Sequence, residues 1–100
     1  MLSHGIDIRC SDSHSIIDLD STERINYAKD ISIGNHVWIA MDARILKGVN
    51  IGSHSIIASG SIVTKDVPEN CIASGVPAQV KRTGVTWLRE NTPIKNDICI

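Results

Sequence analysis

Aliphatic residues recur at every sixth position through the middle of the chain, and this period constrains the fold more than any other feature. The recurring residues are Ile33, Ile39, Ile45, Ile51, Ile57 and Val63. An α-helix repeats about every 3.6 residues and a strand about every 2, so neither element alone accounts for the period. Each unit of six must therefore combine a short regular element with a turn.

A second set of small or β-branched residues lies four positions after each of these aliphatic residues. Its members are Val37, Ala43, Val49, Ser55, Ser61 and Val67. If both sets face inward on a short strand, the residue between them faces outward and two residues remain for a turn. Most of those remaining pairs carry residue types that turns favour. The pairs are Asn35-His36, Met41-Asp42, Lys47-Gly48, Ser53-His54, Ser59-Gly60 and Lys65-Asp66.

Short strands that alternate with corners are typical of a solenoid, in which stacked coils share one narrow core. We therefore predict an all-β fold, a parallel β-helix with regular coils over residues 33–68. A small antiparallel sandwich with fortuitous spacing is the alternative. Six consecutive units obey both inward positions, which favours the solenoid. The absence of Phe and the abundance of Ile and Val also favour a β protein.

The whole-chain properties exclude several classes of partner. One hundred residues suit a single domain, residues 1–100, that gains stability from association. A net charge of −1 and a pI near 6.4 argue against nucleic-acid and membrane-surface binding. Without a signal-like N-terminus or a spanning apolar run, we expect a cytoplasmic protein. The three cysteines, Cys10, Cys71 and Cys99, lack metal-site spacing and are expected to be reduced thiols.

Two segments fall outside the period. Residues 11–30 are a polar insertion between coils, and such long loops are usually functional or disordered. Residues 69–100 form a closing segment and tail. Pro68, Gly75 and Pro77 predict a loop that leaves the last coil and folds back along it. A short helix is expected within residues 83–93, ended before Pro93.

The stretch from Ile33 to Pro68 resembles the hexapeptide-repeat acyltransferases. That resemblance implies a left-handed parallel β-helix with three units of six per turn, whereas general connection rules favour right-handed crossovers. The motif "SDSHSI" and the 24 residues from His14 to Trp38 of "HVWI" are similar to the branch of galactoside, maltose and capsule polysaccharide O-acetyltransferases. The resemblance runs from about Ile8 to Arg82. It implies acetyl-CoA-dependent O-acetylation of a hydroxyl on a sugar or glycoconjugate.

Three units per turn place residues 18 positions apart above one another. Trp38 then lies over Ile56, Arg44 over Ile62, and Asn50 over Pro68, while the corners bring His36 over His54, Met41 over Ser59 and Lys47 over Lys65. The outward face of Trp38 and Ile56 is the most apolar one and should meet a neighbouring subunit or a ligand. We therefore expect a homotrimer whose active sites lie between subunits.

The resemblance assigns catalysis to His14. An acceptor hydroxyl must lose its proton as it attacks a thioester, and imidazole, with an unperturbed pKa of about 6.5, suits a general base at neutral pH. Asp12, Asp18 or a backbone carbonyl would orient the ring. Trp38 would direct its indole or backbone N–H toward the developing oxyanion, or exclude water from the site. The alternatives are a solvated loop histidine and a tryptophan that only packs.

By resemblance, acetyl-CoA contacts fall at Met41, Ser59, Thr64, Lys65 and Arg82. The shared corner of Met41 and Ser59 follows independently from the spacing of 18. Cations would meet the phosphates. Two positions depart from the family pattern: Gln79 stands where arginine is common, and Met41 stands where a small polar residue is common.

Two other functions remain open. Gamma-class carbonic anhydrases use the same solenoid with histidine ligands to zinc, but a catalytic zinc needs three converging ligands. His36 and His54 supply two, and the third would have to be His14 or His4, so we expect no metal. The chain could also be a non-catalytic fragment, because the family's enzymes usually carry further N-terminal coils that help to hold the acceptor.

Overall fold

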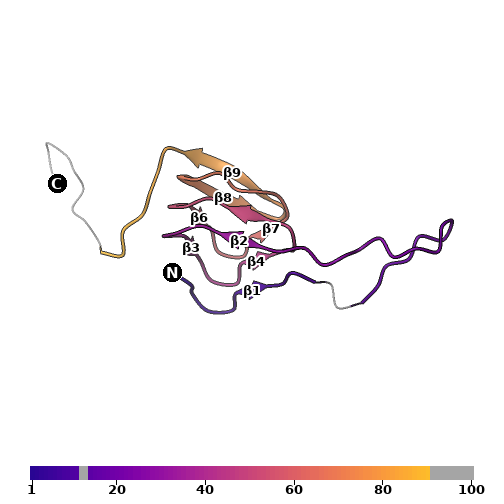
Figure 1. Ribbon diagram of the computed structural model, residues 1–100. Coiled ribbons are helices and arrows are strands. Elements are labelled where there is room, and N and C mark those ends of the chain that lie inside the picture. The colour runs from indigo at the N-terminus through magenta and orange to yellow at the C-terminus, as the bar shows by residue number, and fades with distance from the viewer. Residues whose placement is uncertain (12–13, 91–100) are drawn as a thin grey trace, which may run out of the picture.

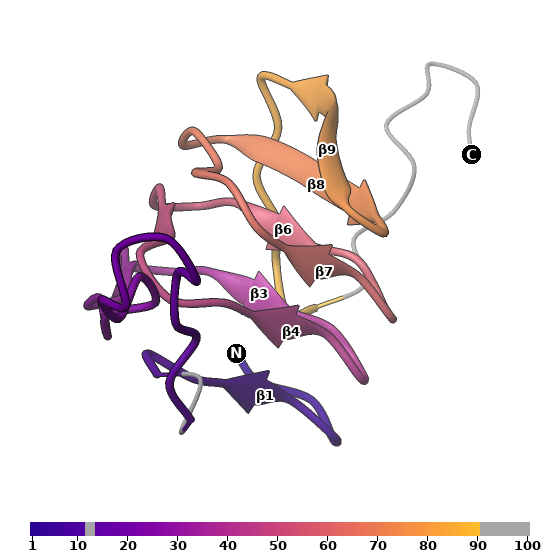
Figure 2. The same cartoon turned by 90° about the vertical axis from the view of Figure 1, so that its right-hand side faces the viewer.

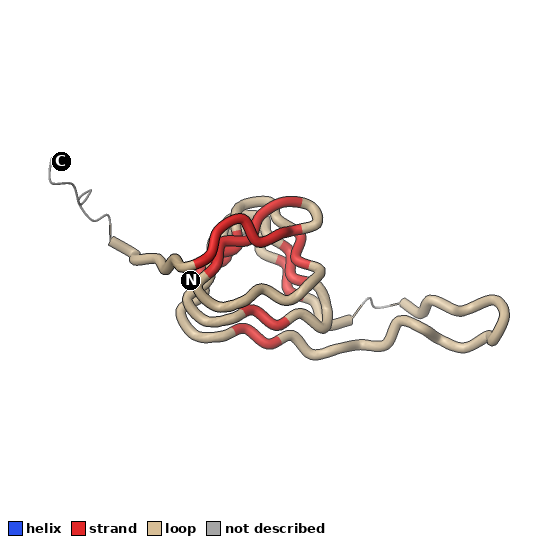
Figure 3. Tube along the Cα trace, turned by 90° about the horizontal axis from the view of Figure 1, so that it is seen from above, coloured by secondary structure: helices blue, strands red, loops and turns tan. Residues whose placement is uncertain are grey.

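The computed structural model describes residues 1–11 and 14–90, and within them short strands wind around three sides of a prism (Figures 1 and 3). The strands are β1 (Asp7–Ile8), β2 (Ser32–Ile33), β3 (Trp38–Ile39), β4 (Arg44–Ile45), β5 (Asn50–Ile51), β6 (Ile56–Ile57), β7 (Ile62–Val63), β8 (Cys71–Gly75) and β9 (Ala78–Thr83). Hydrogen bonds join them into sheets ordered β1-β4-β7, β2-β5 and β3-β6-β8-β9. Consecutive strands up to β7 lie in different sheets, as a parallel β-helix requires.

The predicted register holds through the regular coils. Trp38 pairs with Ile56 and Arg44 pairs with Ile62, and both pairs are 18 positions apart. Figure 2 shows the resulting layers, with β3 and β4 beneath β6 and β7.

The last coil of the β-helix is two residues shorter than the 18 predicted. Ile51 bridges to Val67, which is 16 positions away, so Asn50 does not lie over Pro68. The side chain of Asp66 explains how the ladder continues, because its Oδ1 accepts a hydrogen bond from the Asn50 backbone N–H at 2.8 Å. A carboxylate thus takes the place of a backbone carbonyl in the ladder.

The core consists mainly of the two inward sets that the period predicts, and Cys71 and Ala73 of β8 extend it. All members of both sets are buried except Ile33, which is 37% exposed in β2 and pairs only with β5. Two buried polar members, Ser55 and Ser61, satisfy their hydroxyls locally: Ser55 donates to the Gly52 carbonyl, and Ser61 accepts from the Gly75 N–H. The small inward residues therefore bring no unpaired hydroxyl into the core.

The corners use left-handed backbone at the second residue of the predicted turn pairs. His36, Asp42, Gly48, His54 and Gly60 have φ between 55° and 77°. Glycine adopts this region without strain, and His, Asp and Asn tolerate it better than other residues do. The prediction of a turn in each unit is confirmed at these five corners.

The polar insertion forms an arm that projects from the coils (Figures 1 and 3). Its two sides run antiparallel, with a bridge between Ile17 and Arg24 and a hydrogen bond from the Ile25 N–H to the Ile16 carbonyl at 2.9 Å. The chain leaves the arm where the Lys29 N–H donates to the Cys10 carbonyl. The arm, defined here as residues 14–29, thus interrupts a coil without breaking the stack.

The closing segment is not the predicted loop. β8 adds in parallel to β6, and β9 returns antiparallel to β8 through a turn that contains Gly75 and a cis bond before Pro77. The prediction was wrong because Gly75 and Pro77 occupy only the turn of this hairpin and Pro68 precedes β8, while the residues on either side of the turn pair as strands.

A short helix was expected within residues 83–93, but none forms in residues 83–90, the part of this segment that the structure describes. β9 continues to Thr83, and the segment that follows, residues 84–90, runs back across the coils as a strap. Its Val85 N–H donates to the Asn70 carbonyl, and Trp87 is only 9% exposed. These tertiary contacts favour extended backbone. Residues 91–100, which include the rest of the predicted helix and Cys99, lie outside the described residues.

Nothing in residues 1–11 or 14–90 forms a helix that could cross a membrane. Of the three cysteines, Cys10 and Cys71 are free thiols, as predicted.

The shared core makes a testable prediction at Ile57, which is fully buried. Ile57→Ala should lower the free energy of unfolding by about 2–5 kcal/mol, because neighbouring coils cannot close around the cavity. Leu88→Ala, at a side chain that is 60% exposed, is the matched control and should change it by less than about 0.5 kcal/mol. Urea unfolding measures both. Equal costs would contradict a core shared between coils.

Candidate active site

His14 lies at the base of the arm with its side chain exposed. Its backbone is held by Asn26, which is buried and donates from Nδ2 to the His14 carbonyl at 2.6 Å. The Oδ1 of Asn26 accepts from the Ile16 N–H at 2.6 Å and from Arg24 Nε at 3.2 Å. One amide therefore ties the two sides of the arm together next to His14 and leaves the imidazole open to solvent.

The sequence did not point to Asn26 as a residue that positions His14. An amide offers two donors and an acceptor, so it can join both sides of an irregular loop where a carboxylate cannot. Of the carboxylates expected to orient His14, Asp18 instead accepts from the Asp20 N–H, within the arm. Asp12 lies outside the described residues.

Trp38 lies in β3, within the coils, and its apolar face is partly covered by the strap. The rings of Trp38 and Trp87 have centroids 6.0 Å apart. The face that was expected to meet a neighbouring subunit or a ligand thus meets the chain's own C-terminal segment first. The indole Nε1 of Trp38 is buried and has no hydrogen-bond partner in the part of the chain that the structure describes. It is a donor without an acceptor.

The structure does not bring His14 and Trp38 together in one chain. The arm that carries His14 projects from the coils, away from the side where β3 lies (Figure 1). The two predicted catalytic groups can therefore cooperate only across copies of the chain or after a rearrangement of the arm.

His36 and His54 are exposed at their corner, and they also contact the strap or each other. The His36 ring stacks on Trp87 with centroids 4.0 Å apart and planes 10° apart, and its Nδ1 lies 3.1 Å from His54 Nδ1. Trp87 Nε1 also donates to the His36 carbonyl at 2.8 Å. His36 and His54 therefore help to hold the strap. Among residues 1–11 and 14–90, no group of three or more His, Cys, Asp or Glu side chains is arranged to hold a metal ion.

The predicted cofactor contacts occupy three places on the surface. Met41 and Ser59 share one corner, as the spacing predicts, and the Gly60 N–H donates to the Met41 carbonyl there at 2.9 Å. Thr64 and Lys65 follow β7, at the opposite end of that strand, and Arg82 lies on β9 opposite Ile72. All five residues are exposed. They do not line a single cleft of one chain.

The corner that carries Lys47 and Lys65 is cationic, and its row of lysines is longer than the sequence suggested. Lys47 and Lys65 lie 18 positions apart, next to the paired Ile45 and Val63, and Lys29 extends the row by one more coil. The Gly48 N–H donates to the Lys29 carbonyl, and a Cβ on Gly48 would lie 3.1 Å from the Lys29 Cδ. Glycine at this corner therefore lets the lysine stem pack closely. The signal was available, because Lys29 lies 18 positions before Lys47, but the arm hid it.

Comparisons with known proteins agree with this architecture. Residues 30–65 match the model of the bacterial transferase hexapeptide (six repeats) family. A polysialic acid O-acetyltransferase of Escherichia coli O1:K1 / APEC is 47% identical over 89 residues, which are 89% of this chain and 29% of that protein. The chain thus spans less than a third of this relative.

Two solved structures are similar to these coils. The polysialic acid O-acetyltransferase OatWY superposes with a TM-score of 0.87 and 38% identity, over 90% of this chain and 43% of that one. A galactoside acetyltransferase in complex with coenzyme A gives a TM-score of 0.63 and 35% identity, over 82% of this chain and 44% of that one.

Residues 30–65 carry the hexapeptide repeat, and the chain is similar to the galactoside and polysialic acid O-acetyltransferases. The resemblance on which the sequence analysis relied is therefore confirmed. So is the left-handed parallel β-helix that it implied.

The contacts of the strap give a second prediction. His36→Asn removes the stacked ring but keeps a residue that tolerates the left-handed corner. We expect stability to fall by about 0.5–1.5 kcal/mol, the usual contribution of an aromatic pair, and the tryptophan emission to shift to the red. His4→Asn is the control, because His4 is exposed and makes no side-chain interaction with the described residues. Unchanged emission in His36→Asn would show that the histidine does not hold the strap.

Proposed function

We propose that this protein transfers an acetyl group from acetyl-CoA to a hydroxyl of a sugar or glycoconjugate. The observation that carries the proposal is the histidine arm: an exposed imidazole on a backbone fixed by Asn26, beside hexapeptide coils. The relatives add support, since one is a polysialic acid O-acetyltransferase and another is a galactoside acetyltransferase in complex with coenzyme A.

In this mechanism His14 acts as the general base. Its imidazole takes the proton of the acceptor hydroxyl while the oxygen attacks the thioester carbonyl, and it returns the proton to the sulfur as the C–S bond breaks and the C–O ester bond forms. The products are the acetylated sugar and free CoA. The buried indole N–H of Trp38 is a candidate donor to the oxyanion, because it has no acceptor among the described residues.

The donor would lie along the coils. Met41 and Ser59 would flank its pantetheine arm, and Thr64, Lys65 and Arg82 would meet its nucleotide end. These residues are exposed at three places on one chain. A binding groove that uses all of them needs a second surface to complete it.

We propose a homotrimer that supplies this surface, with each arm reaching a neighbouring subunit. The arm exposes apolar side chains that a lone chain would leave in water: Leu19 is 91% exposed, Ile25 59% and Ile16 54%. Packing them on a neighbour buries this surface and carries His14 to another chain's coils.

Sedimentation velocity at micromolar concentration tests the assembly. We expect a species of about three times the 10.9 kDa chain mass. Leu19→Glu should dissociate it by placing a charge in the interface, while Leu88→Glu, on the strap, should leave it intact. A monomer under these conditions would contradict the trimer.

The catalytic proposal is tested at His14. His14→Ala should lower kcat by about 10²–10⁴, the usual contribution of a positioned general base. The affinity for CoA and the unfolding midpoint should hardly change, because the exposed ring supports no core contact. Release of the free CoA thiol measures turnover with polysialic acid, galactosides and maltose as acceptors.

The control for this experiment is His4→Ala, not a variant of His36 or His54, because those two rings hold the strap. Chloramphenicol and serine serve as acceptors that should not react. If His14→Ala kept most of the activity, the general base would lie elsewhere. If the unmutated protein bound CoA but acetylated none of the saccharides, the proposal of a sugar O-acetyltransferase would fail.

A further inference from the structure

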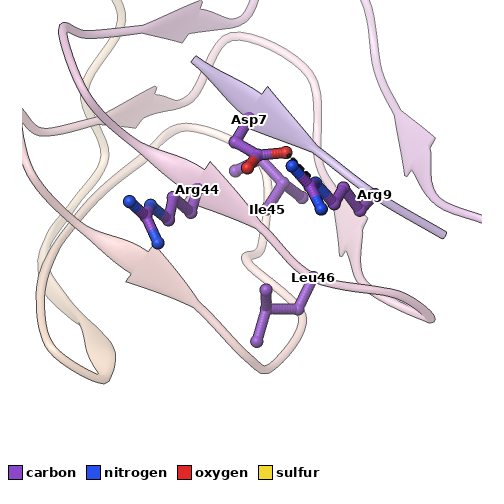
Figure 4. A pocket seen from close by; sticks show the side chains of 5 residues that line it. All are labelled: Asp7, Arg9, Arg44, Ile45 and Leu46. Atoms are coloured by element: carbon purple, nitrogen blue, oxygen red, sulfur yellow. Dashed lines mark hydrogen bonds and ion pairs between the residues drawn. The ribbon is translucent and has the colours of Figure 1, made fainter. Parts of the chain in front are cut away.

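A pocket of about 330 Å³ on the outer face of β1 and β4 carries two arginines that the proposed mechanism does not use (Figure 4). Asp7 and Arg9 come from β1 and its end, and Arg44, Ile45 and Leu46 come from β4 and its end. Its volume lies within the range usual for small-molecule sites.

The register of the two strands explains this arrangement. Asp7 lies opposite Arg44 and Ile8 lies opposite Ile45, so the next residues, Arg9 and Leu46, also adjoin. Residues two apart on a strand share a face, which places Asp7 and Arg9 on the same side of the sheet as Arg44 and Leu46. The two guanidinium groups therefore flank one carboxylate.

Arg9 is held in place but keeps most of its donors. Its Nε donates to Asp7 Oδ1 at 2.8 Å, which fixes the plane of the guanidinium. A guanidinium carries five N–H donors, and this ion pair uses one of them. The terminal N–H groups of Arg9 therefore remain available to an incoming acceptor.

Arg44 is exposed and forms no ion pair or side-chain hydrogen bond with any residue of the described segments. With Asp7 and Arg9 the pocket carries a net charge of +1. Guanidinium groups recognise planar oxyanions through paired N–H donors, and carboxylates suit this geometry.

The other residues that line the pocket favour a ligand whose carboxylate belongs to a sugar. Asp7 uses Oδ1 for Arg9, and its Oδ2 has no partner among the described residues, so it can accept from hydroxyls. Leu46 is 39% exposed and offers an apolar surface to the C–H face of a ring. Anion, hydroxyl and apolar recognition thus occur within one pocket.

We propose that this pocket binds the carboxylate of an acidic saccharide and so selects the acceptor of the acetyl transfer. The inference deepens the proposed function, and it rests on that function in treating the bound saccharide as the acceptor. A phosphate group of CoA is the competing occupant of the same cationic chemistry. A sugar carboxylate fits the pocket better, because the neighbouring sugar hydroxyls can donate to Asp7 Oδ2, whereas an ionised phosphate has no donor for it.

The position along the chain fits a subsite next to the reaction centre. Five peptide units separate Arg9 from His14, and an extended chain of that length spans at most about 18 Å. A sugar held in the pocket can therefore belong to the same oligosaccharide as the hydroxyl that reaches His14. An acidic polymer would offer both groups in a single chain.

Calorimetric titration of the whole chain without acetyl-CoA tests the pocket apart from turnover. The probes are a tetramer of N-acetylneuraminic acid, a tetramer of galacturonic acid, and the methyl ester of each. We expect at least one acid tetramer to bind about 10-fold or more tightly than its ester. Arg44→Gln should weaken that binding about 10-fold to 100-fold, the range for lost charge-assisted hydrogen bonds.

Lys81→Gln is the matched control, since it removes one exposed positive charge on β9, outside the pocket, and should leave acid binding unchanged. Circular dichroism should show that both variants are folded, as expected for exposed side chains. Nε–Hε NMR signals of Arg9 and Arg44 should shift with the acid tetramer and not with its ester.

Three results would overturn the proposal: neither acid tetramer binds better than its ester, Arg44→Gln binds the acid as well as the unmutated protein does, or Arg44→Gln weakens CoA binding instead. The last result would assign the pocket to the phosphates. Failure of the acetyltransferase proposal is a separate outcome, namely Arg44-dependent acid binding without acetyl transfer. Acetyl transfer to neutral saccharides only, without acid binding, would keep the enzyme and remove this subsite.

Discussion

The structure depends on one interaction: two residues from each unit of six are buried against the coils above and below. Each strand is only two residues long through most of the stack, and such a strand has no stability by itself. Ile39, Ile45 and Ile57 become almost fully inaccessible only because equivalent residues lie one coil away. The arm, the corners and the surface pocket all take their positions from this ladder, so the chemistry of the outer faces is set by the inward period.

The same ladder explains which parts of the fold could be predicted. The core and the corners follow a local rule that repeats every six residues, and five left-handed corners fall at the expected positions. The shortened last turn breaks the rule, because the Asp66 side chain replaces a backbone acceptor and no period records such a substitution. The strap was missed for a related reason: Trp87 meets His36 across 51 positions, and its neighbours in sequence carry no trace of that contact.

The candidate site was predictable in part. The motif located His14 and the spacing of 18 located the corner of Met41 and Ser59. Neither signal could indicate that these groups are separated in one chain, because that depends on the direction in which the arm leaves the coils. Asn26 was also missed, since it lies in the insertion, where the period gives no guide. Lys29 was missed although it lies 18 positions before Lys47. The sequence assigned no role to Arg9 or Arg44, and only the register places them on either side of Asp7.

Asn26 anchors the base of the arm, and a different hydrogen bond closes the turn near its tip. The bonds of Asn26 reach His14, Ile16 and Arg24, whereas the turn near the tip is closed by a bond from the Thr22 N–H to the Asp18 carbonyl. The tip can therefore gain or lose residues without moving the histidine. In evolutionary terms the arm is a module in which reach and chemistry vary independently: its length can adapt to bulkier or more distant surfaces while the backbone that presents His14 stays the same.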